Sequence, residues 1–407
     1  MNLSPSVKRL IVLIAVCFVD MVGLMIIAPL MPFYALRFHA QDWMVGWLYS
    51  AFSMAQLVAS PLWGRFSDRY GRRPALIAGL LGACAAYLVF GFATSLTVLF
   101  LSRIVQGLGG GTTGVAQAYV ADSMEPAERA KALGWVSAGT SLGVIVGPPL
   151  GGLATSLGPA APGLVAAGLV FVNAVCAWKW LPESRHRYSA ANPSAPTTSP
   201  RSVQETFWEI VRHPTLPAPR VIWIYVIGML ALTGLIGVLA LYLKDTFGVT
   251  EKGIGYVFMV FGAVGVIMRT APVGWINARL GEVRTMRLGA VLVLAGLALI
   301  PIPPLLTVCV ACLVLVPIGN ALLFPASTSL VSQRTERAEM GQVMGAQQTL
   351  RGIASIIGPI GATAAYQAFG HWIPFAAAAV VVAGALFLAA REPHQQPVTA
   401  TPATIKA

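Results

Sequence analysis

Residues 64–74 read GRFSDRYGRRP, and residues 274–284, which lie 210 positions further along the chain, read GWINARLGEVR. Two further matches keep nearly the same offset. The text ERA at 128–130 recurs at 336–338, and Gly134 precedes Gly147-Pro148 by thirteen positions just as Gly345 precedes Gly358-Pro359. These matches predict a chain built from two similar halves. Parallel repeated halves that hold a substrate between them are a known transporter architecture.

The composition indicates that lipid surrounds most of this chain. Of its 407 residues 57% are hydrophobic and only 10% are charged, and the mean hydropathy is +0.74. A soluble globular protein carries about 25% charged residues. Twelve apolar segments each approach the ~20 residues that a helix needs to cross a hydrocarbon core. They lie at 10–36, 44–64, 74–93, 97–120, 131–155, 162–181, 220–243, 253–276, 285–302, 305–330, 341–366 and 371–390.

The basic residues give the orientation. The net charge of +12 comes mostly from the termini and from alternate loops, for example Lys8, Arg9, Arg65, Arg129 and Lys131. Only Arg37, Lys244 and Lys252 fall in the opposite set of loops. Lysine and arginine collect on the cytoplasmic side of membrane proteins. We therefore expect both termini in the cytoplasm. We expect no nucleic-acid partner, because the basic residues follow the membrane topology and do not form one basic surface that could contact nucleic acid.

The composition also divides the chain into domains. Residues 182–202 read PESRHRYSAANPSAPTTSPRS, and an amphipathic run follows at Phe207–Val211. We expect a six-helix bundle at 1–181, a cytoplasmic linker with an interfacial helix at 182–219, a second bundle at 220–391 and a cytoplasmic tail at 392–407. The predicted fold class is thus an all-α integral membrane protein with twelve transmembrane helices in two pseudo-symmetric bundles.

Four motifs resemble those of one family. GRFSDRYGRRP at 64–74, SRIVQGLGGG at 102–111 and GTSLGVIVGPPLGG at 139–152 are similar to signatures of the major facilitator superfamily. The last is similar to the antiporter motif of its drug/proton antiporters. DMVGLMIIAPLMP at 20–32 resembles the corresponding helix of the twelve-helix antiporters, the tetracycline exporters in particular.

The motif at 64–74 is expected to be a short cytoplasmic turn that controls conformation. The resemblance implies that Asp68 braces the inner ends of the two halves near the start of the eleventh helix, while Arg129 is another plausible partner. An anion near a helix N-terminus is stabilised by about 0.3–1 kcal/mol. A solvated positive loop is the alternative for the arginines. The expected gating residues of this region are Gly64, Asp68, Arg69, Arg72, Arg73 and Arg129.

The fifth segment carries a glycine face. Gly139, Gly143, Gly147 and Gly151 recur every four positions, so they share one side of a helix and permit close packing. We expect this packing at the interface between the halves, with a kink at Pro148 and Pro149. The resemblance implies that the bend also keeps an antiporter's closed state leak-tight.

Charges inside the apolar segments are expected to be functional, because a charge at mid-membrane is costly. Asp20 lies 20 − 9 = 11 residues beyond Arg9, which is about 16 Å of helix rise and places it near the midplane. It is the only acid that we place deep in the bilayer, so we expect it to carry a coupling proton. The resemblance implies that Arg103 helps to govern the release of that proton. For Arg103, Arg269 and Arg351, structural ion pairing is the alternative.

The substrate is expected between the halves. Aromatic, methionine and amide side chains suit an amphiphilic organic molecule, although each one taken singly is commonly just a packing residue. The predicted contacts are Met25, Tyr49, Gln56, Gln106, Thr113, Gln117, Tyr225, Met229, Thr233, Tyr256, Asn320, Phe324, Gln347 and Arg351.

The sequence features bear on three function classes. The first is a proton-coupled antiporter that exports an amphiphilic drug or metabolite. The second is a proton-coupled symporter or facilitator for an anionic metabolite, favoured by the excess of buried arginine over acid, with Arg351 and Arg103 as anion clamps. The third, a receptor or enzyme, is disfavoured because the sequence has neither GxxxxGK[ST] nor HExxH. We expect no enzymatic activity, no cofactor and no metal. The expected partners are a small molecule, protons and the lipid bilayer, and the expected form is a monomer in a bacterial cytoplasmic membrane.

Overall fold

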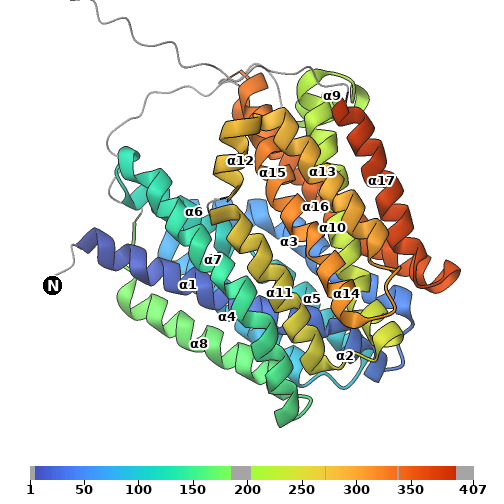
Figure 1. The fold of residues 1–407 in the computed structure, drawn as a ribbon. Helices are drawn as coiled ribbons and strands as arrows, with labels where there is room; N and C mark the ends of the chain where they lie inside the picture. The colour runs from blue at the N-terminus through green and yellow to red at the C-terminus, as the bar shows by residue number, and fades with distance from the viewer. Residues whose placement is uncertain (1–4, 185–202, 271, 337–338, 391–407) are drawn as a thin grey trace, which may run out of the picture.

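The computed structural model describes residues 5–184, 203–270, 272–336 and 339–390, and these residues are helices joined by short connections (Figure 1). The first half contains α1 (Pro5–Ile27), η1 (Ala28–Leu30), α2 (Met31–Arg37), α3 (Asp42–Tyr70), α4 (Arg72–Gly91), α5 (Leu96–Gly109), α6 (Thr112–Ser123), α7 (Pro126–Ala154), η2 (Thr155–Leu157) and α8 (Ala161–Trp180). The second half contains α10 (Pro217–Phe247), α11 (Glu251–Thr270), α12 (Pro272–Leu280), α13 (Glu282–Leu299), α14 (Leu306–Leu313), α15 (Leu315–Arg334), α16 (Met340–Phe369) and α17 (Ile373–Ala390). The predicted all-α membrane architecture is confirmed.

The helices follow the twelve expected segments in order, and several segments are broken by glycine or proline. Gly110 and Gly111 separate α5 from α6, and Pro272 begins α12. By length and composition, eight helical stretches of the described chain are apolar enough to cross a membrane. Neither α3 nor α16 is among them, and both contain several glycine, glutamine and serine residues, which lower the mean hydropathy. The number twelve for crossing helices stays a prediction.

The short helix α9 (Val203–Arg212) lies in the expected linker region. Its apolar side is covered by the second half, since Ile210 is buried and its carbonyl accepts from Trp223 Nε1 at 3.0 Å. Thr206 Oγ1 lies 3.3 Å from Gln342 Oε1 of α16. We call this end of the molecule, where α8 ends and α10 begins, the linker end. Residues 185–202 of the linker and the predicted tail at 392–407 lie outside the described residues.

Each of the two repeated motifs contains a glycine that joins two helices, and both glycines have a positive φ. Gly71 has φ 107° and Gly281, which is 210 positions later, has φ 75°. Both angles lie in a region that is essentially reserved for glycine. The motif at 64–74 is therefore mostly helical, which corrects the expected turn: α3 continues to Tyr70, and α4 starts directly after Gly71. The shared conformation supports the repeat that the sequence indicated.

The two halves meet closely away from the linker end. Ser50 Oγ on α3 donates to the carbonyl of Ile356 on α16 at 2.6 Å, and Thr363 Oγ1 donates to the carbonyl of Trp43 at 3.3 Å. At the extreme end Arg37 Nη2 lies 2.5 Å from Glu251 Oε1. We call this line of contacts along α3 and α16, together with its counterpart along α7 and α11, the seam.

The seam ends about halfway along the helices. Among the glycines of α16, the one nearest the linker end that contacts the first half is Gly352, where an added Cβ would lie 2.8 Å from Leu57 Cδ1. Towards the linker end, the same faces of α3 and α16 continue with Gly64, Gly345 and Gly341, and an added Cβ at any of these would meet no atom within 4 Å. The contact between α7 and α11 also opens towards the linker end. An added Cβ on Gly262 of α11 would contact Val144 of α7, whereas an added Cβ on Gly134 of α7 would meet no atom within 4 Å. The described halves are thus closed on one side and separated at these glycines of the linker end.

Candidate functional site

Asp20 lies in the middle of α1 and is half-buried. Its Oδ2 accepts a hydrogen bond from Thr112 Oγ1 at 2.7 Å. Thr112 stands at the start of α6, directly after the glycine break, so the break brings a hydroxyl to the carboxyl group. The buried Tyr87 of α4 is within electrostatic range of both Asp20 and Arg103. Asp20 therefore faces the interior of the first half and not lipid.

Arg103 is buried in the same half, with only 4% of its surface exposed. Its guanidinium lies 5.6 Å from the ring centre of Phe90, and its Nε and Nη2 have no hydrogen-bond partner. A buried guanidinium without a partner is costly. Such a group is expected to gain a partner when the surroundings change.

Asp20 and Arg103 were expected to act together. Among the described residues the ion pairs do not include one between them. Tyr87 and Gln106 form a bridge instead, because Gln106 Nε2 donates to Tyr87 OH at 3.1 Å while Tyr87 is near both charges. The structure thus brings the two charges into one polar cluster without direct contact.

The remaining predicted substrate residues of the first half have separate environments. Tyr49 OH donates to the carbonyl of Ala28 at 2.6 Å, and Gln56 Nε2 donates to the carbonyl of Gly110 at 3.2 Å. Met25 packs against Gly147. Thr113 and Gln117 are exposed on α6.

In the second half, Tyr225 and Phe324 form one aromatic pair with ring centres 5.0 Å apart. Asn320, one turn before Phe324, is 3% exposed, and neither its Nδ2 nor its Oδ1 has a partner. Gln347 is also buried, and its Oε1 has no partner. These residues lie on α10, α15 and α16.

Three further predicted contacts behave differently. Met229 is buried, and Thr233 Oγ1 donates to the carbonyl of Ala354 at 3.2 Å, so both support the packing of α10. Tyr256 is 48% exposed on α11.

Arg269 and Arg351 lie on α11 and α16, each near the point where the seam ends. Both are exposed, and the two guanidinium groups repel each other. Tyr225 is within electrostatic range of Arg269. The alternative for these arginines was structural ion pairing. The ion pairs of the described residues include neither Arg269 nor Arg351, so the structure does not support that alternative.

The glycine face of α7 packs against α1 within the first half. Added Cβ atoms on Gly143 and Gly147 would lie 2.8 Å from the carbonyl oxygen of Phe18 and 2.9 Å from that of Val22, respectively. Gly151 likewise approaches Ile26. This corrects the expectation that these glycines pack between the halves. The spacing identifies one face but not its neighbour, and the contact with α11 comes from the adjacent face, where Pro148 meets Gly255.

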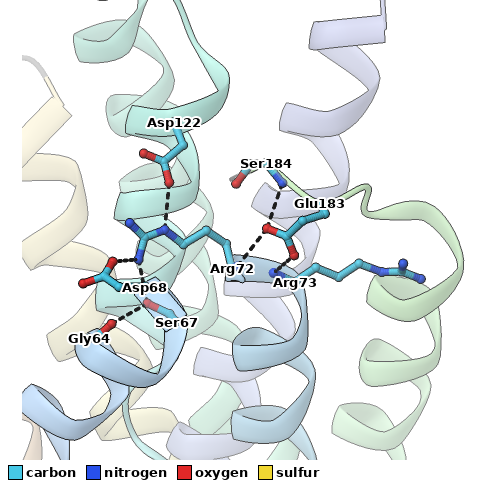
Figure 2. Close-up of polar contacts among 8 residues, drawn as sticks. All are labelled: Gly64, Ser67, Asp68, Arg72, Arg73, Asp122, Glu183 and Ser184. Atoms are coloured by element: carbon cyan, nitrogen blue, oxygen red, sulfur yellow. Dashed lines mark hydrogen bonds and ion pairs between the residues drawn. The ribbon is translucent and has the colours of Figure 1, made fainter. Parts of the chain in front are cut away.

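At the linker end, one arginine joins three elements of the first half (Figure 2). Arg72 Nη1 lies 2.5 Å from Asp68 Oδ1, and its Nε lies 2.7 Å from Asp122 Oδ2. Glu183 accepts from the backbone nitrogens of Arg72 and Arg73 at 2.9 and 3.1 Å, which satisfies the start of α4. We call Asp68, Arg72, Asp122 and Glu183 the loop network.

The expected gating residues are placed around this network. The Asp68 side chain is 65% exposed and is paired inside its own half, so it does not brace the second half in this conformation. Arg129, its alternative partner, donates from Nε to the carbonyl of Met124 at 3.2 Å. Arg69 lies with its guanidinium 5.4 Å from the ring centre of Tyr70, and Arg73 Nη2 donates to the carbonyl of Trp178.

A second group of titratable residues lies at the opposite end of the molecule. Asp42, which precedes the apolar segment 44–64, is near Asp245, Lys244 and His371 of the second half. Burial and the Asp245 carboxylate raise the pKa of Asp42 above its ordinary value of 3.8, whereas Lys244 and His371 act in the opposite direction. Because the pKa is raised in the closed seam, the contact is favoured at low pH and weakens as the pH rises through that pKa.

Sequence reasoning missed Asp122 and Glu183, the two acids that hold the loop network. A signal was available, since an acid at the end of the fourth and sixth segments faces a cluster of arginines across a short distance. Phe90 and the bridging role of Tyr87 were also missed, because segment lengths give depth but not the rotation of each helix.

Comparisons with known proteins cover nearly the whole chain. The sequence profile of the family described as Major Facilitator Superfamily matches residues 13–359 and 270–405. The chain is 27% identical over 366 residues to the tetracycline resistance protein, class B, of Escherichia coli, and the match covers 88% of each protein. It is 30% identical over 358 residues to multidrug resistance protein 2 of Bacillus subtilis (strain 168), with 86% of each covered.

Among solved structures, a bacterial homologue of the human lysosomal transporter Spinster, in an inward-facing and unoccupied conformation, superposes with a TM-score of 0.79. The identity is 15%, and the alignment covers 96% of this chain and 97% of that one. At this identity the likeness establishes a common fold.

Proposed function

The chain belongs to the major facilitator superfamily, and from this premise we propose that it is a proton-coupled antiporter that exports an amphiphilic drug or metabolite by alternating access. Relatives named as tetracycline and multidrug resistance proteins support a drug-like substrate. The chain is a multi-pass membrane protein, and we propose the bacterial cytoplasmic membrane as its location, with the linker end and both termini in the cytoplasm. The positive charges near the linker end support this orientation.

The observation that carries the proposal is the position of Asp20. Its carboxyl group is held by Thr112 beside buried Tyr87, in the half that also contains the unpartnered guanidinium of Arg103. An acid in the membrane interior is costly and therefore functional by default. The proton affinity of a carboxyl depends on its solvation and on nearby charges. A rearrangement that changes the distance between Asp20 and Arg103 would therefore couple proton release to conformation.

The separation of the halves supports an inward-open resting state. Residues on the substrate-facing sides of α3, α7 and α16 have open space at the linker end, while the seam closes the opposite side. In this conformation a compound would enter from the cytoplasm. We propose that Asp68 exchanges Arg72 for the start of α16 when the linker end closes, and that a single chain is sufficient for the cycle.

The test is proton movement in inverted membrane vesicles that contain the full chain, an acidic lumen and a pH-sensitive dye. Addition of a panel of cationic, neutral and anionic drugs should collapse the gradient for at least one compound in the wild type. Asp20→Asn should abolish this response while it still binds the same compound in detergent, because the neutral amide keeps the shape but holds no exchangeable proton. A wild-type response from Asp20→Asn would remove Asp20 from the mechanism, and the same response from empty vesicles would exclude antiport.

A further inference from the structure

The second half contains Arg269 and Arg351, and the ion pairs of the described residues give neither of them an acidic partner. Arg269 lies on α11 seven positions after Gly262, so it is on the same face as the seam contact with Val144 and just beyond it. Arg351 lies on α16 directly before Gly352, the seam contact with Leu57. Among the described residues, the one hydrogen bond of either guanidinium joins Arg351 Nη1 to Gln348 Oε1 at 3.5 Å. Both are exposed at the open side of the molecule.

The two guanidinium groups are within electrostatic range of each other. Two like charges held together without a counter-ion raise the free energy of the empty site. A group that carries negative charge and binds between them would relieve this repulsion. Guanidinium groups bind carboxylates and phosphates through paired hydrogen bonds that are stronger than neutral ones.

The surroundings of this pair point to an aromatic ligand. One turn before Arg269, α11 packs on α15, since an added Cβ on Gly265 would lie 3.6 Å from Pro317 Cβ. The ring of Phe324 on α15 lies 5.0 Å from that of Tyr225, which is within electrostatic range of Arg269. Asn320 is on the same face of α15, one turn away, and is almost fully buried with both polar atoms unpartnered. Buried amides without partners are rare in folded proteins. This amide is therefore available to a polar group on a bound molecule.

We infer that Arg269 and Arg351 form the binding site for the anionic group of the exported compound, whose aromatic body lies against Tyr225 and Phe324. The transported class is thus an aromatic amphiphile that carries a carboxylate, sulfonate or phosphate. This inference rests on the proposed export function, because it names the substrate class of the same site. The arrangement also separates two tasks: the first half holds the proton through Asp20, and the second half holds the substrate anion.

The test compares three probes of the same size: 2-naphthoate, the neutral 2-naphthamide and the cation 2-naphthylmethylammonium. Binding to the full chain in detergent is measured by thermal stabilisation, and transport is measured by gradient collapse in inverted vesicles. The half-saturating concentration should be lowest for 2-naphthoate. Arg269→Gln and Arg351→Gln should each raise it about 10- to 100-fold, the range expected for loss of one charge-assisted hydrogen bond, and should leave the value for 2-naphthamide unchanged.

Two further variants control for charge and folding. Arg351→Lys keeps the charge and should retain most of the affinity for 2-naphthoate. Arg279→Gln removes an arginine of the same half that stacks on Trp275 at 4.0 Å, and it should bind 2-naphthoate like the wild type. The melting temperature of each variant without ligand identifies any that fails to fold.

The outcomes distinguish this inference from the proposed function. Absence of binding by 2-naphthoate to the wild type, equal affinity for all three probes, or unchanged affinity in both glutamine variants overturns the inference. If a cationic drug such as ethidium nevertheless collapses the gradient, the antiport proposal stands without it. If 2-naphthoate binding depends on both arginines but no compound in the panel moves protons, the anion site stands and proton coupling fails.

Discussion

At the scale of single residues, Gly151 shows how closely α7 approaches α1. A Cβ at this position would lie 2.9 Å from the carbonyl carbon of Ile26, which is main chain and cannot rotate away. We expect Gly151→Ala to destabilise the protein by about 1–3 kcal/mol, the usual range for overpacking. The measurement is the melting temperature in detergent.

The matched control is on the same helix. Gly134 has no neighbour within 4 Å, so Gly134→Ala adds only helix propensity and should be neutral or stabilising by up to about 1 kcal/mol. Equal melting temperatures for the two variants would contradict the close packing of α1 and α7.

In the first half, the sequence predicted the depth of Asp20 but not the partner of its carboxyl group. The depth of Asp20 follows from the rise per residue, and the structure places its carboxyl group in the protein interior. The partner of that carboxyl is Thr112, which comes from a helix that restarts after three consecutive glycines. Backbone breaks change the rotation of the following helix, and no apolar pattern encodes that rotation.

At the scale of helices, variants of the loop network should affect stability and transport differently. Asp68 is 65% exposed, and surface ion pairs contribute about 0–1 kcal/mol. We therefore expect Asp68→Asn to leave the melting temperature nearly unchanged. If Asp68 stabilises the start of α16 in the other conformation, the variant should reduce the transport rate about two- to fivefold, which corresponds to about 0.3–1 kcal/mol for a carboxylate at a helix N-terminus.

Asp122→Asn is the matched comparison, because Asp122 binds the same arginine but is less exposed, at 31%. It should lower the melting temperature more than Asp68→Asn and affect transport less. If Asp68→Asn instead lowers the melting temperature more and affects transport less, the gating role belongs to Asp122. Vesicle transport and detergent melting are sufficient to decide.

Helix ends were the least predictable feature of the elements. The apolar pattern ended the second segment at residue 64, whereas α3 continues to Tyr70. Hydropathy reports the lipid core, but a helix extends beyond it for as long as its backbone can hydrogen-bond. The actual end is Gly71, whose positive φ terminates α3 and whose missing side chain leaves room for Glu183.

At the scale of the whole molecule, the seam should be trappable by a disulfide. Leu57 Cγ lies 3.6 Å from the position of a Cβ on Gly352, so two cysteines there can approach the spacing that a disulfide requires. In a background where Cys17, Cys84, Cys176, Cys309 and Cys312 are replaced, oxidation of Leu57→Cys/Gly352→Cys should cross-link the halves and stop transport. Reduction should restore it.

The control pair is Gly64→Cys/Gly345→Cys, which belongs to the same two helices beyond the end of the seam. Both positions have open space, so this pair should not cross-link in the resting protein. Rapid cross-linking of the control pair, or full transport by the cross-linked seam variant, would contradict the inward-open resting state.

The repeat in the sequence predicted two halves but could not predict how they are tilted. Gly71 and Gly281 adopt the same kind of conformation because they occupy equivalent positions, and this local feature is encoded in the text of each half. The tilt depends on which end of the seam is closed. Composition and the apolar pattern of the segments do not encode which end is closed.

The chemistry of the seam has a consequence for how this protein can diversify. Ser50 and Thr363 each donate to a carbonyl oxygen of the opposite half, and every residue type supplies that acceptor. Mutations at Ile356 and Trp43 therefore leave the acceptor atom in place, while the hydroxyl donors are the vulnerable members. Closure of the seam therefore tolerates substitutions on the acceptor side. Residues on neighbouring turns can therefore change without loss of the hydrogen bonds that close the seam.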